Sequence, residues 1–291
     1  MDHTRIDRVV NVPALRRATV TVVGVGGAAG AVRHLTRCGV ETFHLIDPDV
    51  VGPENICRQE HMADQIGQPK VDAVAAELRR INPAVRVDGH RRDICSFSDV
   101  EARDRFGATD LFVATTDSYA AQRRVSQMAL MLNTPAVFVG VYAGGGAGEV
   151  GFWHPDLKSC YGCLTEERRK AQEADPGDPP SDGATIVDVS YIDALALMVG
   201  IGLLTRGSDN RYGRLIARLG VRNFLQVKID PDFGWEGEDF FARELGIPAG
   251  TDAYFGCVAI ARRNPDPGGD CPDCVRYRLR GIRAVPYSTW H

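Results

Sequence analysis

The chain has 291 residues, of which 44% are hydrophobic and 25% charged, the composition of a globular protein with one large domain or a domain and a subdomain. Its net charge of −4 at pH 7 differs from the basic charge of a dedicated nucleic-acid-binding domain, so we expect no nucleic-acid partner. The N-terminus lacks the apolar segment of a signal peptide, and the longest apolar run, 194–204, is too short to span a bilayer; we expect a cytoplasmic protein with no membrane partner.

Strand and helix patterns alternate through roughly the first 140 residues. Strands are predicted at 18–25, 41–46, 85–90, 110–117 and 135–142, and helices at 26–39, 67–83 and 118–133. This alternation is typical of βαβ units, and it predicts an α/β, Rossmann-like fold with a mainly parallel sheet and helices on both faces.

The second half of the chain is less regular. Strands are predicted at 148–153, 224–229 and 254–263, and a buried helix at 187–205. Residues 165–184 are charged, rich in Pro and Gly and almost free of apolar side chains, which predicts a mobile segment. We therefore divide the chain into a Rossmann-like domain at 1–163, a flexible crossover at 164–186, and a C-terminal part at 187–291 that completes the domain.

A glycine-rich turn, GVGGAAG at 24–30, follows the first predicted strand and opens a helix. Gly24 would allow the tight turn, and Gly26 and Gly27 would let backbone N–H groups approach a phosphate. Asp47 ends the second strand, near the spacing at which an acid meets ribose hydroxyls. The pattern indicates an adenine nucleotide, with NAD(P) as the default; the alternative is a turn needed only for helix–strand packing.

The segment DPDVVGPENICRQ at 47–59 carries polar groups that suit a polyphosphate. Asn55 offers an amide donor and Arg58 a planar cation, and Lys70 opens the helix that follows. Two cations near a glycine turn favour a triphosphate over a dinucleotide, although either cation alone is more often a solvated surface charge.

Asp117 ends the predicted strand 110–117, and the carboxyl ends of parallel strands face the ligand crevice. Its carboxylate could hold Mg²⁺ bound to phosphates. The alternative is an N-cap for the helix that starts at Ser118.

Two C-x-x-C pairs contain Cys160 and Cys163, and Cys271 and Cys274. Four thiolates match a structural, tetrahedral zinc site, which would tie the C-terminal segment to the middle of the chain. Such a closed site leaves no position for catalysis. The alternatives are two redox-active pairs or unlinked thiols.

Together these motifs resemble those of the ThiF/MoeB/HesA family of ubiquitin-activating-enzyme-like adenylyltransferases. The resemblance rests on the order GxGG, D-x-D-x-V…N-x-x-R-Q, G-x-x-K, T-D and paired C-x-x-C, and it runs from about residue 5 to about residue 274, with 165–184 and 206–253 poorly matched. It implies that ATP and Mg²⁺ are used to adenylate a carboxylate, often the C-terminus of a ubiquitin-like sulfur-carrier protein, or of a peptide.

The resemblance also implies roles for individual residues. Gly24, Gly26 and Gly27 match the nucleotide turn, and Asp47 matches the acid that binds the ribose. The phosphate site is matched by Asn55, Arg58 and Lys70, with Gln59 beside them, and the Mg²⁺/ATP aspartate by Asp117. The structural Zn²⁺ ligands are matched by Cys160, Cys163, Cys271 and Cys274. Arg5 and Arg8 match an N-terminal Arg-x-x-Arg pattern, which implies a homodimer in which Arg8 acts in the partner's ATP site.

The sequence departs from the family pattern at three places. The third glycine of the turn is replaced by Ala29, the segment 164–186 lacks the cysteine that forms a thioester or persulfide, and the insertion 206–253 has no counterpart. We therefore expect the adenylate to pass to another nucleophile, with Cys57 and Cys257 as the remaining candidate thiols. The alternative functions are a catalytically inactive scaffold and an NAD(P)-binding oxidoreductase.

Overall fold

One sheet runs through the whole fold, parallel in its first half and antiparallel in its second. A computed structural model describes residues 1–177, 183–230, 233, 258–262 and 271–278. Within these residues, eight strands form the sheet in the order β3-β2-β1-β4-β5-β6-β7-β8. Their bounds are β1 Thr19–Val23, β2 Thr42–Ile46, β3 Arg86–His90, β4 Leu111–Ala114, β5 Ala136–Val141, β6 Ala147–Trp153, β7 Phe224–Lys228 and β8 Val258–Arg262.

The sheet changes from parallel to antiparallel at β5. Strands β3, β2, β1, β4 and β5 pair in parallel, and β5–β6, β6–β7 and β7–β8 pair antiparallel. The turn between β5 and β6 is short and contains Gly144 and Gly145, both at positive φ, which glycine adopts without strain. The predicted Rossmann-like, mainly parallel sheet is confirmed.

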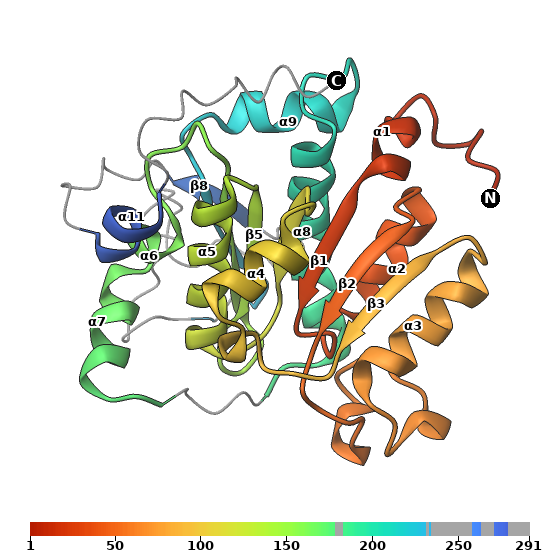
Figure 1. The fold of residues 1–291 in the computed structure, drawn as a ribbon, viewed down its shortest axis with the longest axis horizontal. Coiled ribbons are helices and arrows are strands. Elements are labelled where there is room, and N and C mark those ends of the chain that lie inside the picture. Colours follow the sequence, from red (N-terminus) through yellow and green to blue (C-terminus); the bar gives the residue numbers. More distant parts are fainter. Residues whose placement is uncertain (178–182, 231–232, 234–257, 263–270, 279–291) are drawn as a thin grey trace.

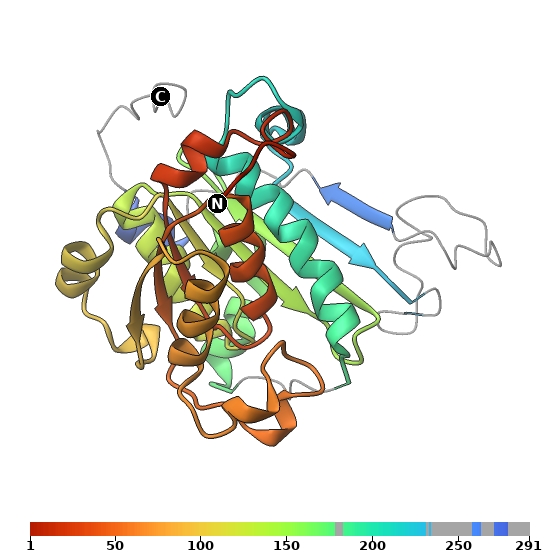
Figure 2. The same ribbon diagram turned by 90° about the vertical axis from the view of Figure 1, so that its right-hand side faces the viewer.

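Helices cover both faces of the sheet, as predicted. Their bounds are α1 Val12–Arg17, α2 Ala29–Cys38, α3 Lys70–Ile81, α4 Asp99–Phe106, α5 Tyr119–Leu132, α6 Tyr161–Leu164, α7 Glu166–Ala174, α8 Ile186–Leu204, α9 Arg211–Leu219 and α11 Pro272–Tyr277. Helices α2, α3 and α8 pack on one face, and α4 and α5 on the other (Figures 1 and 2).

The helix ends follow from local sequence. Ser98 and Glu101 form a capping box at the start of α4, and the Ser118 hydroxyl caps α5. Helix α5 ends at Asn133, which adopts the left-handed conformation (φ 55°), and α2 ends at Gly39 (φ 120°). These caps set where each helix leaves the sheet.

Helix α8 is the apolar helix at the centre of one face. It is longer than the run 194–204, and by length and composition alone its 19 residues would be enough to cross a membrane. It packs against β4, β5, β6 and α2, and contributes Ile192, Val199 and Ile201 to the core. Burial between the sheet and its neighbours therefore accounts for its apolar composition.

The prediction of a mobile segment at 165–184 is wrong for its first half, where α7 forms. Helix α7 buries none of its side chains, so it is held by charge pairs instead. The Arg168 guanidinium contacts both oxygens of the Glu149 carboxylate on β6, at 2.6 and 2.9 Å. Glu149 is 2% exposed, so this pair anchors the helix to the sheet.

The segment 206–253 forms more structure than predicted in its first part. The strand expected at 224–229 is present as β7, and the strand expected at 254–263 is present as β8. Helix α9 was missed, although Asn210 caps it and it packs against α8. Residues 231–232 and 234–253, with Cys257, lie outside the described residues. The division of the chain into a domain at 1–163, a crossover at 164–186 and a C-terminal part at 187–291 stays a prediction.

Replacing Arg168 by Ala should lower the free energy of unfolding by about 2 kcal/mol, because it leaves the buried Glu149 carboxylate without its cation. Urea denaturation measures the change. The matched control is Lys170→Ala, which removes an exposed cation of the same helix and should leave the stability unchanged. Equal effects of the two substitutions would contradict the role of the Arg168–Glu149 pair.

Candidate active site

A cavity of about 1590 Å³ opens at the carboxyl ends of β1, β2, β4 and β5. It lies where the order of the parallel strands reverses direction, between β1 and β4, which is the usual ligand crevice of an open α/β sheet. The predicted residues that line it are Gly24, Gly26, Gly27, Asp47, Asn55, Arg58, Gln59, Lys70 and Asp117. The structure therefore brings every predicted nucleotide-site residue except Arg8 to one place.

The turn after β1 is fixed by its contact with β4. Gly24 has a φ of 82°, and a Cβ atom there would lie 2.9 Å from the Thr116 backbone nitrogen, so only glycine fits. The Thr115 hydroxyl donates a hydrogen bond to the Gly24 carbonyl at 2.6 Å. The tight turn predicted for Gly24 is therefore present, and it joins two neighbouring strand ends.

Gly26 leaves room for a neighbouring side chain, and its predicted role in the approach of a phosphate stays a prediction. A Cβ atom at Gly26 would lie 2.7 Å from the Gln59 side-chain amide, so the missing side chain makes room for Gln59. The Gln59 Oε1 atom is buried and has no hydrogen-bond partner among the described residues. Gly27 faces α8, where the Val189 Cγ1 atom would lie 3.2 Å from a Cβ atom at Gly27. Gln59 thus packs the loop 47–59 against the turn.

Asp47 is buried beside the turn. Its Oδ2 accepts a hydrogen bond from the Val25 N–H at 2.8 Å, and its Oδ1 accepts one from the Asp49 N–H at 2.9 Å. Burial raises the pKa of Asp47, while these hydrogen bonds and the charge of Lys70 act in the opposite direction. The carboxylate is therefore held rigidly, and its remaining lone pairs can accept hydrogen bonds from hydroxyl groups.

The two cations reach the cavity from the same loop and the helix after it. The Lys70 side chain is 8% exposed, and its ammonium contacts the Asp49 carboxylate at 3.0 Å. Arg58 is half-buried and lines the cavity. The Asn55 Oδ1 accepts a hydrogen bond from the Gly52 N–H at 2.9 Å, so this side chain shapes the loop as well as lining the cavity.

Asp117 follows β4 and is exposed to the cavity. Its alternative role as the helix N-cap is wrong, because the Ser118 hydroxyl accepts the hydrogen bond from the Ala121 N–H. In the part of the chain that the structure describes, the Asp117 carboxylate accepts no hydrogen bond. It is thus available to a cation or a ligand.

Arg5 and Arg8 lie elsewhere on the molecule. Both are exposed, and Arg8 lines a smaller pocket of about 490 Å³ with Asn11 and Ser208. This pocket is lined by residues of α1, which precedes β1 and lies at the amino ends of the strands (Figure 1), whereas the large cavity lies at their carboxyl ends. Arg8 therefore cannot belong to the large cavity of its own chain.

Several cavity residues were not predicted. Arg168 and Gln172 of α7 line it, as do Tyr142 after β5 and Asp193 of α8. The spacing of Glu166 and Lys170 by four residues was a signal for α7. An acid in the middle of an apolar helix was the signal for Asp193; burial, together with the charge of Glu60, raises the pKa of Asp193 to about 8.

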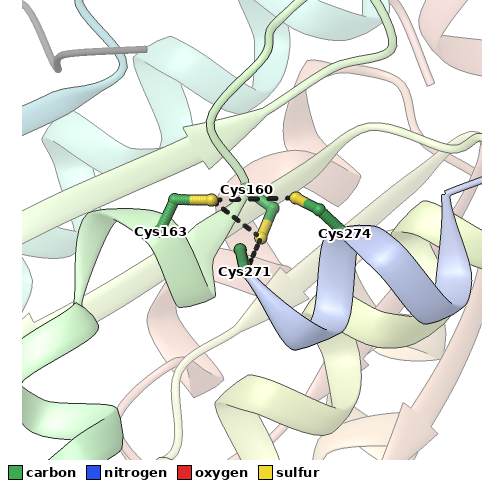
Figure 3. A group of neighbouring side chains, drawn as sticks. All are labelled: Cys160, Cys163, Cys271 and Cys274. Carbon is green, nitrogen blue, oxygen red and sulfur yellow. Dashed lines mark hydrogen bonds between the residues drawn. The ribbon is translucent and has the colours of Figure 1, made fainter. Parts of the chain in front are cut away.

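The four cysteines of the C-x-x-C pairs meet beside α5 and form a four-cysteine cluster (Figure 3). The Sγ atoms of Cys160 and Cys163, of Cys160 and Cys271, and of Cys163 and Cys274 are each 3.7 Å apart. A tetrahedral zinc ion with Zn–S bonds of about 2.3 Å has S–S edges of about 3.8 Å, whereas a disulfide needs about 2.05 Å. The four sulfurs therefore fit a zinc ion and form no disulfide.

A buried acid helps to attach the C-terminal segment to helix α5. Asp273 lies between Cys271 and Cys274 and is 2% exposed. Its carboxylate accepts hydrogen bonds from the Arg123 guanidinium at 2.9 and 3.1 Å, and from the Gln127 amide at 2.9 Å. Both donors lie on α5, so the C-terminal segment is tied to the helix that begins at the cavity.

Comparison with known proteins finds sequence relatives. The ThiF family model matches residues 8–205. The chain is 30% identical over 246 residues to the sulfur carrier protein adenylyltransferase of Thermus thermophilus, covering 79% of this chain and 86% of the relative. It is 32% identical over 168 residues to ubiquitin-like modifier-activating enzyme 5 of Bombyx mori, covering 55% of this chain but only 43% of that relative.

Solved structures share the fold at lower identity. Escherichia coli MccB, crystallised with ATP, matches with a TM-score of 0.63 and 17% identity over 90% of this chain and 68% of MccB. MccB in complex with N-formylated MccA matches with a TM-score of 0.62 and 15% identity, over 90% of this chain and 69% of MccB.

Replacing Cys271 by Ser should remove about one zinc ion per chain, because a tetrahedral site that loses one thiolate of four is no longer closed. Metal analysis of the purified protein measures the loss. The matched control is Cys57→Ser. Because Cys57 is exposed and lies outside the cluster, the zinc content of this variant should equal that of the wild type. Equal zinc in all three proteins would show that the cluster is not the metal site.

Proposed function

Since the chain belongs to the ThiF family, we propose that it is an ATP-dependent adenylyltransferase that activates a carboxylate as an acyl-adenylate and releases pyrophosphate. The observation that carries this proposal is the composition of one cavity. A glycine turn and a buried acid suited to a nucleoside share it with Arg58, Lys70 and Asp117. NAD(P) would leave the two cations and the exposed acid without a role.

The reaction needs charge stabilisation more than proton transfer. The acceptor carboxylate, already ionised, forms a bond to the α-phosphorus, and the bond to the β-phosphate oxygen breaks with departure of pyrophosphate. Negative charge on the phosphates is then balanced by Arg58 and Lys70, while Asp47 orients the ribose through its hydroxyl groups. Lys70 is well placed for this role, since its burial limits it to partners inside the cavity.

A magnesium ion fits the acids of the cavity. Asp117 accepts no hydrogen bond within the described residues and could bind Mg²⁺ directly, as carboxylates commonly do beside phosphates. When bound, the ion would neutralise charge on the phosphates of ATP.

The acceptor is a protein or peptide C-terminus in this proposal. The cavity exceeds the roughly 300–1,000 Å³ of a typical small-molecule site, which leaves room for an extended chain end beside ATP. The names of the relatives point the same way, since they refer to a sulfur carrier protein, a ubiquitin-like modifier and MccA. Arg168 and Gln172 of the crossover helix would line the path of that chain end.

Transfer from the adenylate would go to a nucleophile outside this chain. Cys57 is the only cysteine that lines the described part of the cavity, and its thiol contacts the Glu54 carbonyl at 3.4 Å. A cytoplasmic setting agrees with this proposal, since a reducing compartment keeps zinc-binding thiolates intact.

We further propose that the active unit is a homodimer. Arg8 is exposed and separated from the cavity of its own chain, so the role that the resemblance implies for it requires the cavity of a second copy. A cation supplied in this way would contact the phosphates from the side that the first chain leaves open.

Replacing Asp117 by Ala should lower the exchange of labelled pyrophosphate into ATP by about 100-fold or more, because the metal loses its protein ligand. The assay uses ATP, Mg²⁺ and candidate acceptors. The matched control is Asp104→Ala, an exposed acid on α4 outside the cavity lining, which should retain wild-type exchange. ATP binding without exchange for every acceptor would favour the inactive scaffold, and preference for NADH over ATP would exclude adenylation.

Action of Arg8 in trans can be tested by complementation. Arg8→Ala and Asp117→Ala should each be nearly inactive alone, but co-expression of equal amounts should restore about one quarter of wild-type exchange. Half of the dimers are then mixed, and one of the two sites in each mixed dimer has both residues intact. No recovery in the mixed dimers would argue against a shared site.

A further inference from the structure

Three side chains of metal-binding types lie together on β2 and β3, away from both the cavity and the four-cysteine cluster. His44 on β2 pairs in register with Asp88 on β3, and Ile46 pairs with His90. Because side chains alternate along a strand, His44, Asp88 and His90 point to the same face of the sheet. That face is the one that carries α4, at the β3 edge (Figure 1).

The distances within this group are those of metal ligands. The Asp88 Oδ2 atom lies 3.4 Å from the His44 Nδ1 and 3.2 Å from the His90 Nε2. Both nitrogens are buried, and neither has a hydrogen-bond partner in the described parts of the chain, so the contacts with Asp88 do not meet hydrogen-bond geometry. All three ligand atoms lie within 4.8 Å of one another.

A single ion would satisfy these atoms. Zinc–nitrogen and zinc–oxygen bonds of about 2.1 Å in a tetrahedral site give ligand–ligand edges of about 3.4 Å, close to the two distances seen here. We propose that His44, Asp88 and His90 form a second metal site, which binds a divalent transition-metal ion such as zinc.

The surroundings hold the two imidazoles in place before any ion binds. The rings of Phe97 and Phe106 meet the His90 ring edge to face at 5.7 and 5.5 Å, and Phe106 meets the His44 ring at 5.4 Å. Phe97 and Phe106 also pack against each other at 5.3 Å. Rings fixed by packing do not need to be ordered on binding, which favours affinity.

The ligand set determines which ions fit. Two imidazoles and one carboxylate suit zinc, cobalt, nickel or iron(II), whereas Mg²⁺ and Ca²⁺ prefer oxygen ligands. Asp88 is 60% exposed, so water can complete the coordination. Arg92 and Arg105 lie near enough to lower the pKa of His90, after the larger effect of burial, and their charges also reduce the affinity for a cation. We therefore expect this site to fill only when metal is added.

The position of the site suggests a structural effect. The ion would join β3, the edge strand, to β2, the strand that leads into Asp47. The Asp47 N–H donates to the His90 carbonyl at 3.1 Å, so the ribose acid and the metal site share one stretch of backbone. Binding should therefore stabilise the edge of the sheet next to the cavity.

The test is a zinc titration of the purified protein by calorimetry, combined with metal analysis after dialysis. The wild type should take up one ion per chain more than Asp88→Asn or His90→Gln, and binding by each variant should be about 100-fold weaker or absent. Asp88→Asn retains the shape of an exposed side chain, and its fold can be verified by circular dichroism. Cobalt bound by His44, Asp88 and His90 of the wild type should give visible absorption bands but no sulfur-to-metal absorption. The visible bands should be absent in His90→Gln.

Two matched controls exclude surface binding. His34→Gln removes an exposed histidine of α2, and Asp104→Asn an exposed acid of α4; both should titrate like the wild type. Identical titrations of the wild type and Asp88→Asn, or no uptake by the wild type, would overturn the proposal. Because the comparison is a difference between variants with an intact four-cysteine cluster, neither zinc at that cluster nor adenylation activity affects it.

Discussion

The candidate active site depends on one constraint, the parallel pairing of β2, β1, β4 and β5. Parallel strands end at the same edge of a sheet, so the residues that follow each strand meet there although they are far apart in the chain. The hydrogen bond from Thr115 to the Gly24 carbonyl fixes the two central strand ends against each other. The loop 47–59 and Lys70 can then add charge around a framework that is already rigid.

Much of this arrangement could be predicted because it follows from local patterns. Buried β-branched runs alternate with helical periods, and a glycine turn or an acid directly after a strand must lie at the ligand edge. The role of Gly24 and the position of Asp117 follow from that rule. The close approach of Gln59 to Gly26 does not follow from that rule, because only the folded loop creates this contact.

The unpredicted features share a different physical origin. Helix α7 has no apolar face, and its anchor is a pairing of Arg168 with a buried acid on another element. The group of His44, Asp88 and His90 depends on strand register, which a sequence does not specify between strands joined by a long crossover. Both cases involve polar groups that find each other across the fold, and hydrophobic periodicity contains no information about such pairs.

The four-cysteine cluster joins parts of the chain that are made at different times. Two of its ligands precede the crossover, and the other two come more than a hundred residues later, with Cys160 and Cys271 separated by 111 positions. During synthesis the five parallel strands leave the ribosome long before Cys274, so they can pair while the cluster is still half complete. A zinc ion held by these four thiolates would have its full ligand set only once Cys274 is made, so its uptake would follow the pairing of the parallel strands.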